Sequence, residues 1–120
     1  MLVPMAAISL AAFGNAAEAG PGKWRVTRVL IGDDERTCGP QHVQRFNVEI
    51  KDGVVRRWSS SGAARDLKLL APLNGDGSGK VIALNSKNQE VALDIDPGTG
   101  PRTIRYTRPY SVCSYAWIPV

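Results

Sequence analysis

The stretch Phe46–Trp58, FNVEIKDGVVRRW, decides the fold of this chain. Two runs of residues with high strand propensity flank Asp52-Gly53, and an Asp-Gly step between such runs is the strongest short-range signal of a β-hairpin. Phe46, Val48 and Ile50 alternate with polar residues, which predicts one inner and one outer face for the first strand. We therefore expect an antiparallel hairpin at the centre of the fold.

The register of this hairpin has two alternatives. A two-residue type I′ turn places Glu49 opposite Arg56 on the outer face and Val48 opposite Arg57 on the inner face. A three-residue loop with Gly53 as a bulge instead places Val48 opposite Arg56. In either register one arginine points inward, where it needs a carboxylate, carbonyl groups, a bound anion or water. We expect it to lie near the mouth of the fold, where water reaches it.

From Trp24 to Val120 the chain repeats this pattern of short alternating runs and turn residues, without a convincing helical period. Ala63–Leu70 reads either as a short helical turn or as a strand, and we favour a strand at Leu67–Leu70. The remaining strands are expected at Lys23–Ile31, Lys80–Asn85, Glu90–Ile95, Arg102–Thr107 and Ser111–Val120. A strand about every dozen residues predicts an all-β fold, a small antiparallel barrel or sandwich of seven to eight strands.

The first residues of the chain read as an export signal. Leu2–Phe13 is an apolar stretch of signal length, and Ala17-Glu18-Ala19 provides the small residues that a cleavage site needs. No Lys or Arg precedes Lys23, so the usual positive region is missing, and a buried N-terminal helix is the alternative. We expect residues 1–19 to be a signal peptide and residues 20–120 a single β domain, periplasmic or secreted, with no membrane span after signal removal.

Cys38 and Cys113 are the only two cysteines. An even number of cysteines in an exported chain predicts a disulfide, here between the first loop and the last strand. Cys38 also precedes the single histidine, His42, in CGPQH, a spacing that raises the alternative of a thiol nucleophile with a base. Gly39-Pro40 disfavours a helical geometry between them, so we expect the disulfide.

The sequence offers no arrangement that points to catalysis. It lacks Ser-His-Asp elements and metal-ligand spacing, and the adjacent carboxylates Asp33, Asp34 and Glu35 read as a solvated acidic loop. Asn74–Gly79, NGDGSG, partly matches a calcium loop, but Asn85 stands where that loop needs a bidentate glutamate. We therefore expect a solvated turn there, and we expect no enzymatic activity, no catalytic residue, no cofactor and no metal.

The chain is basic, with a formal net charge of +4. A basic balance favours anionic partners, although it also serves solubility. Arginine and aromatic residues interleave in two segments, and these give the residues that we expect to bind a ligand: Arg56, Arg57, Trp58, Arg105, Arg108 and Tyr110. A single-stranded nucleic-acid platform uses the same residue types, but an exported protein seldom meets nucleic acid, so we expect no nucleic-acid partner.

Gly22-Lys23-Trp24 opens the first strand. In an exported all-β chain with a disulfide to its C-terminal strand, this resembles the G-x-W start of calycin-type barrels: lipocalins, avidins and the small periplasmic inhibitors of secreted metalloproteases. The resemblance implies that Trp24 closes one end of a barrel. The mature length suits the inhibitors, but the cysteines lie farther apart than in them, and no inhibitory segment is seen beyond Gly20-Pro21. The chain is also similar to small exported proteins of Gram-negative bacteria with a Trp-x-Val first strand, an Asp-Gly hairpin and one disulfide.

The sequence therefore predicts a monomeric, non-enzymatic, exported binding protein. Its partner is expected to be an unknown protein or an anionic or carbohydrate ligand. Two alternatives are kept: a periplasmic protease inhibitor, and an anion- or carbohydrate-binding module that uses the arginine and aromatic side chains named above.

Overall fold

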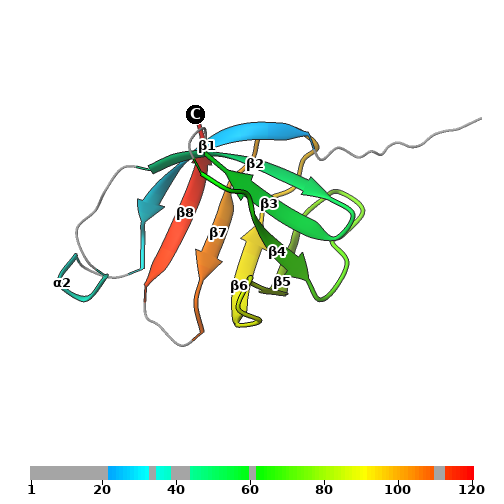
Figure 1. Cartoon of the computed structure of the whole chain (residues 1–120). Helices are drawn as coiled ribbons and strands as arrows, with labels where there is room; N and C mark the ends of the chain where they lie inside the picture. Colours follow the sequence, from blue (N-terminus) through cyan, green and yellow to red (C-terminus); the bar gives the residue numbers. More distant parts are fainter. Residues whose placement is uncertain (1–21, 33–34, 39–43, 60–61, 110–112) are drawn as a thin grey trace, which may run out of the picture.

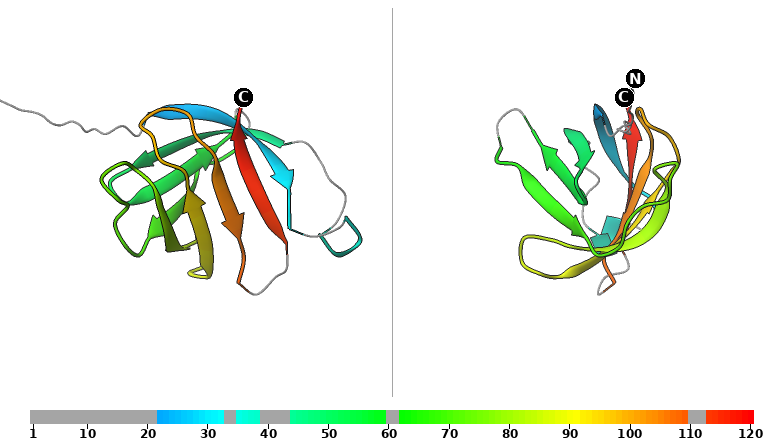
Figure 2. Two further views of the ribbon diagram at one scale, coloured as in Figure 1. Left: turned by 180° about the vertical axis from the view of Figure 1, so that it is seen from behind. Right: turned by 90° about the vertical axis from the view of Figure 1, so that its right-hand side faces the viewer.

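The computed structural model describes residues 22–32, 35–38, 44–59, 62–109 and 113–120. In these residues eight antiparallel strands close into one barrel, in which each strand pairs with the next and β8 pairs with β1 (Figure 1). The strands are β1 (Lys23–Leu30), β2 (Gln44–Lys51), β3 (Val54–Trp58), β4 (Arg65–Leu69), β5 (Gly79–Leu84), β6 (Glu90–Ile95), β7 (Ile104–Thr107) and β8 (Ser114–Pro119). Figure 2 shows the sheet curving round until β1 and β8 lie side by side. The all-β prediction is confirmed, and the architecture is the barrel.

β2 and β3 form the predicted hairpin around Asp52-Gly53. The two turn residues have φ values of 54° and 76°, as a type I′ turn requires. Glu49 pairs with Arg56, and Val48 pairs with Arg57. The two-residue register is therefore the correct one. Because Val48 is fully buried, Arg57 lies on the inner face of the sheet and Arg56 on the outer face.

Three stretches of described residues differ from the sequence-based expectation by more than one residue. The strand expected to begin at Arg102 begins at Ile104. A one-turn helix, α2 (Glu35–Cys38), interrupts the loop after β1 and is set off from the barrel (Figure 1). The strand expected at Leu67–Leu70 is Arg65–Leu69, because the pairing with β3 continues through Asp66 to Arg65. Within the described ranges, no helix is long and apolar enough to cross a membrane.

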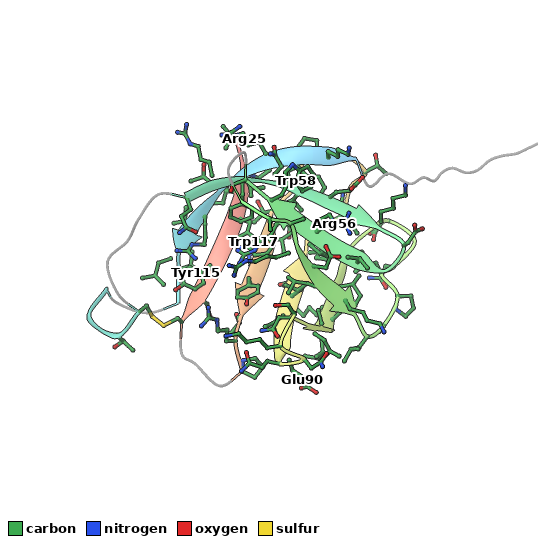
Figure 3. The ribbon with its side chains drawn as sticks, in the orientation of Figure 1. Arg25, Arg56, Trp58, Glu90, Tyr115 and Trp117 are labelled. Carbon is green, nitrogen blue, oxygen red and sulfur yellow. A yellow bond between two sulfur atoms is a disulfide. The ribbon has the colours of Figure 1, made fainter. Side chains whose placement is uncertain are left out.

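Side chains from alternate positions of the strands fill the middle of the barrel. At its centre lies Trp117, which is 1% exposed; Figure 3 shows its side chain inside the sheet. The ring of Phe46 meets it edge-on at 5.1 Å between centroids, and Tyr106 stacks on it at 5.4 Å. A barrel of this size is filled by its own side chains, so a ligand has to bind at one of its ends or on its outer wall.

One end of the barrel is closed by Trp24 and Arg102. Trp24, near the start of β1, is 6% exposed, and the guanidinium carbon of Arg102 lies 4.9 Å from its ring centroid. Arg102 is itself buried, which lowers the pKa of its guanidinium, and its Nη1 donates a hydrogen bond to the Gly100 carbonyl at 3.0 Å. This cation-on-indole contact seals the end at which the chain enters the barrel.

The predicted disulfide joins Cys38, the last residue of α2, to Cys113, the residue before β8. The two Cα atoms are 5.7 Å apart across a sequence separation of 75 residues. The bridge therefore ties the loop after β1 to the start of β8, at the end opposite Trp24. A disulfide of this kind indicates an oxidising compartment.

Candidate anion-binding site

The end of the barrel opposite Trp24 carries arginines on the inner face of the sheet. Arg28 lies on β1, Arg57 on β3, Arg65 on β4, and Arg108 directly follows β7. Each of these arginines has a residue of the hydrophobic core, or one packed against the core, two positions away along the chain, and therefore on the same face of the sheet. These residues are Val26, Val55, Leu67 and Tyr106. All four arginines line one hollow of about 520 Å³. We call Arg28, Arg57, Arg65 and Arg108 the arginine cup.

Arg57 is the innermost member of the arginine cup. Its side chain is partly buried, and its guanidinium carbon lies 5.3 Å from the centroid of Phe46 and 5.5 Å from the centroid of Trp117. These distances place the cation over the aromatic cluster that fills the barrel. Arg28 makes a second contact of this kind, because its guanidinium carbon lies 4.6 Å from the ring centroid of Tyr115. The aromatic core is therefore the floor of the cup.

The surroundings of Arg57 disfavour its charged form. Burial is the main cause, and it lowers the pKa of the guanidinium below its ordinary value. Tyr106 partly offsets this shift, whereas the positive charges of Arg65, Arg28 and Arg108 lower the pKa further. Arginine nevertheless keeps its proton in proteins, so the cup retains a concentrated positive charge.

Arg57 and Arg65 are direct cross-strand partners on β3 and β4. Like charges opposite each other destabilise a sheet by roughly 0.2–1 kcal/mol. The structure therefore contains a local repulsion that an anion bound between the two guanidinium groups would relieve.

Among the described residues, the carboxylates at this end are directed away from the cup. Arg56 and Asp66 form a bidentate pair on the outer face, at 2.8 and 3.0 Å. The second ion pair of the outer wall, Arg105 with Asp96 at 2.8 Å, lies toward the Trp24 end, because Asp96 follows the last residue of β6. Glu90 begins β6 at the same end as the cup, but its side chain projects away from the barrel (Figure 3). In the described part of the chain, no carboxylate pairs with an arginine of the cup.

A second hollow, of about 350 Å³, adjoins the first. The two hollows share Arg57, Arg65 and Arg108 as a common wall. On its far side the second hollow is bordered by the β5–β6 turn, which contributes amide, hydroxyl and ammonium groups: Asn85, Ser86, Lys87 and Gln89. Asp66 also borders the second hollow, but its carboxylate is paired with Arg56, so the mouth of the barrel is a basic surface with two recesses.

The structure brings together part of the predicted ligand-binding set. Arg57, Trp58 and Arg108 all line the larger hollow. Two other predicted residues lie on the outer wall in the ion pairs described above: Arg56 and Arg105. The last one, Tyr110, lies outside the described residues, so its placement stays a prediction.

Sequence reasoning missed Arg28 and Arg65 as site residues. A signal for Arg28 was present, because it alternates in phase with Trp24 and Val26 and so shares their inner face. Arg65 could not be found in this way, because the predicted strand began after it.

Other sequence-based predictions also fall outside the described residues. These are the signal peptide at residues 1–19, the segment Gly20-Pro21 that an inhibitor would have to insert into a protease, Asp33 and Asp34 of the acidic loop, and His42 beside the disulfide. The calcium-like segment is described, and it forms a tight turn in which Ser78 donates its hydroxyl and its backbone N–H to Asp76 Oδ1 at 2.6 and 3.0 Å. These hydrogen bonds lower the pKa of Asp76.

A further hollow, of about 500 Å³, lies on the outer wall across β5, β6 and β7. It is mostly apolar and is bordered by the exposed side chain of Ile82. Lys80, Asp94 and Arg105 bring charges of both signs to it, so its polar groups do not converge on one kind of ligand. The arginine cup has such convergence and is therefore the candidate site.

Comparisons with protein-family models, with curated proteins and with solved structures each found no match to this chain. The assignment of a function therefore rests on the geometry of the arginine cup.

Proposed function

We propose that this chain is an exported, non-enzymatic binding protein, periplasmic or secreted, that holds an anionic ligand in the arginine cup. The observation that carries the proposal is Arg57. Its guanidinium is partly buried over Phe46 and Trp117, lies opposite Arg65, and has no carboxylate partner in the described part of the chain.

The chemistry of arginine favours this ligand class. A guanidinium presents several N–H donors in a planar fork that matches the oxygens of carboxylate, sulfate and phosphate groups. Partial burial strengthens such hydrogen bonds, because the surroundings screen charge less than bulk water does. An anion in the cup would also relieve the repulsion between Arg57 and Arg65.

The four arginines of the cup suit a protein that binds an anion without converting it chemically. The four arginines stay protonated at physiological pH, so they hold and orient an anion rather than transfer a proton to or from it. The disulfide supports export, because such bridges persist in oxidising compartments.

Inorganic sulfate is the simplest probe of the proposal. Isothermal titration calorimetry at low ionic strength should detect sulfate binding to the wild-type protein. Arg57→Gln should weaken the affinity by about tenfold or more, because a hydrogen bond to a charged group contributes roughly 1.5–3 kcal/mol. Arg56→Gln is the matched control, because Arg56 is the next residue of the same strand but faces outward, and its affinity should stay within about twofold of wild type.

Either of two results would overturn the proposal. One is the absence of binding heat with sulfate, and also with phosphate, at millimolar concentration. The other is an equal loss of affinity in Arg57→Gln and Arg56→Gln, which would mean that the anion is attracted by overall charge rather than held in the cup.

A further inference from the structure

The two adjoining hollows at the mouth indicate a ligand with more than one charged group. Arg57, Arg65 and Arg108 form the wall between them, so one compact anion held by these three side chains leaves the outer part of both hollows empty. The hollows have volumes of about 520 and 350 Å³. Each of these volumes lies within the roughly 300–1,000 Å³ typical of small-molecule sites.

Each hollow also has its own cation beyond the shared wall. The larger one is lined by Arg28 and Arg45, and the smaller one by Lys87. Basic side chains therefore run across the whole mouth, from β1 and β2 to the β5–β6 turn. A ligand with repeated negative charges would engage them together, and linking two bound groups in one molecule raises its affinity without new kinds of contact.

The neutral groups beside these cations distinguish between classes of polyanion. Binding of single-stranded nucleic acid relies on successive aromatic faces. At this mouth Phe46 and Trp117 are only 7% and 1% exposed, and they lie beneath Arg57. Of the described aromatic residues, Phe46 and Trp58 border the larger hollow and Tyr106 borders the smaller one, and none of the three is exposed.

The remaining polar groups are amides and hydroxyls. Gln44 and Ser59 border the larger hollow, and Asn85, Ser86 and Gln89 border the smaller one. Asn85 donates to Gln89 and accepts from the backbone of the turn, so Gln44 and Ser59 in the larger hollow and Ser86 in the smaller one are the neutral groups that suit the hydroxyl groups of a sugar. Cations for acidic groups and neutral polar groups for hydroxyl groups thus occur together in both hollows.

We infer that the ligand is an acidic oligosaccharide, with one carboxylate- or sulfate-bearing sugar held in each hollow and the shared wall of Arg57, Arg65 and Arg108 between them. This inference rests on the proposed anion-binding function and adds the class of the ligand. Lys87 is the residue that distinguishes the oligosaccharide inference from the proposed anion site, because at the mouth it borders the smaller hollow and not the larger one.

The test is calorimetric titration of the protein with matched probes. These are inorganic sulfate, galacturonate, a galacturonate tetramer, a heparin-derived tetrasaccharide, neutral maltotetraose and a twelve-nucleotide thymidine strand. At least one acidic tetramer should bind about tenfold or more tightly than galacturonate, and the preferred tetramer distinguishes a carboxylated from a sulfated ligand. Maltotetraose should bind far more weakly than either acidic tetramer.

Lys87→Gln should weaken binding of the preferred tetramer by about threefold, as expected for one exposed charge pair, and should leave sulfate binding within about twofold. This variant should keep the β5–β6 turn, because Asn85 Oδ1 accepts from the backbone N–H of Lys87 and not from its side chain. Lys80→Gln on the outer wall is the matched control, and it should change neither affinity by more than about twofold.

The outcomes separate failure of this inference from failure of the proposed function. If sulfate binds through Arg57 but both acidic tetramers bind no more tightly than galacturonate, the oligosaccharide inference is wrong and the anion site stands. If the thymidine strand binds as tightly as the best tetramer and depends equally on Lys87, the ligand is a nucleic acid and the inference is also wrong. If none of the anions binds, both proposals fail.

Discussion

Replacing Arg57 with leucine should make the unliganded protein more stable. The site holds a partly buried cation that faces Arg65 and has no carboxylate partner among the described residues. Functional sites of this kind are often kept at the expense of stability. In Arg57→Leu an apolar side chain takes the same position over Phe46 and Trp117, and the repulsion disappears.

The size of the effect follows from opposing contributions. Two cation–π contacts are lost, at centroid distances of 5.3 and 5.5 Å, and together they contribute about 1–2 kcal/mol. Relief of the like-charge pair returns roughly 0.2–1 kcal/mol. Removing a desolvated, unsatisfied charge returns about 1–3 kcal/mol, and burying part of a leucine side chain adds about 1 kcal/mol. These ranges sum to a net gain of roughly 0.2–4 kcal/mol. The central value of about 2 kcal/mol corresponds to a rise in Tm of roughly 8–16 °C for a domain of this size.

Calorimetric melting without sulfate measures the stability of the unliganded proteins, and melting with sulfate measures the stability that anion binding adds. In wild-type protein, sulfate at about a hundred times its dissociation constant should add roughly 2.7 kcal/mol of stability through binding. Arg57→Leu should gain only the general stabilisation that sulfate gives to any folded protein. Wild type should therefore melt below Arg57→Leu without sulfate and above it in saturating sulfate. The Tm of Arg56→Leu should rise with sulfate by as much as that of wild type.

A loss of about 1 kcal/mol or more in sulfate-free Arg57→Leu would refute this reasoning. It would mean that Arg57 holds the barrel together and already has an acceptor. The anion site would then be unnecessary to explain why an arginine lies on the inner face.

Three further predictions concern the scaffold. Cys113→Ser, which removes the disulfide across 75 residues, should lower the free energy of unfolding by up to about 4.5 kcal/mol through chain entropy; an unchanged urea midpoint would contradict this. Gly77→Ala should cost about 2 kcal/mol, because the residue has a φ of +83° and a Cβ there would lie 2.7 Å from a carbonyl oxygen, whereas Gly75→Ala, with nothing within 4 Å, should melt like wild type. A hydrogen bond from Arg56 lowers the pKa of Asp66 below its ordinary value of 3.8. The stability that the ionised Asp66 contributes is therefore present above pH 3.8 and is lost as the pH falls through the lowered pKa. Below pH 4 the Tm of Asp66→Asn should fall less steeply with pH than that of wild type, and parallel curves of Tm against pH would contradict the pairing.

The fold could be predicted from local sequence because its strands are short and antiparallel. The alternation of Phe46, Val48 and Ile50 predicts the inner face of the hairpin, and Asp52-Gly53 after them predicts the hairpin and its turn type. Closure into a barrel could not be predicted in this way. It depends on the pairing of β1 with β8, including Arg28 opposite Trp117, which joins residues far apart in the sequence.

The site was only partly predictable, for a related reason. Clusters of arginine beside aromatic residues drew attention to Arg56 and Arg57 equally, and only the register of the hairpin separates the inward residue from the outward one. Arg105 and Arg108 are separated in the same way, because a strand turns successive side chains to opposite faces. Arg65 was missed because the boundary of a strand depends on its partner strand, here the end of β3.

The most direct test of the arginine cup is an NMR titration that follows the arginine side-chain Nε–H signals during the addition of sulfate. We predict large, saturable shifts for Arg57 and Arg65, with the same dissociation constant as calorimetry gives. The signals of Arg56 and Arg105, which are held in ion pairs on the outer wall, should stay nearly unmoved. Saturable shifts confined to the outer arginines, or no saturable shift at Arg57, would contradict the central claim that the mouth of this barrel binds an anion.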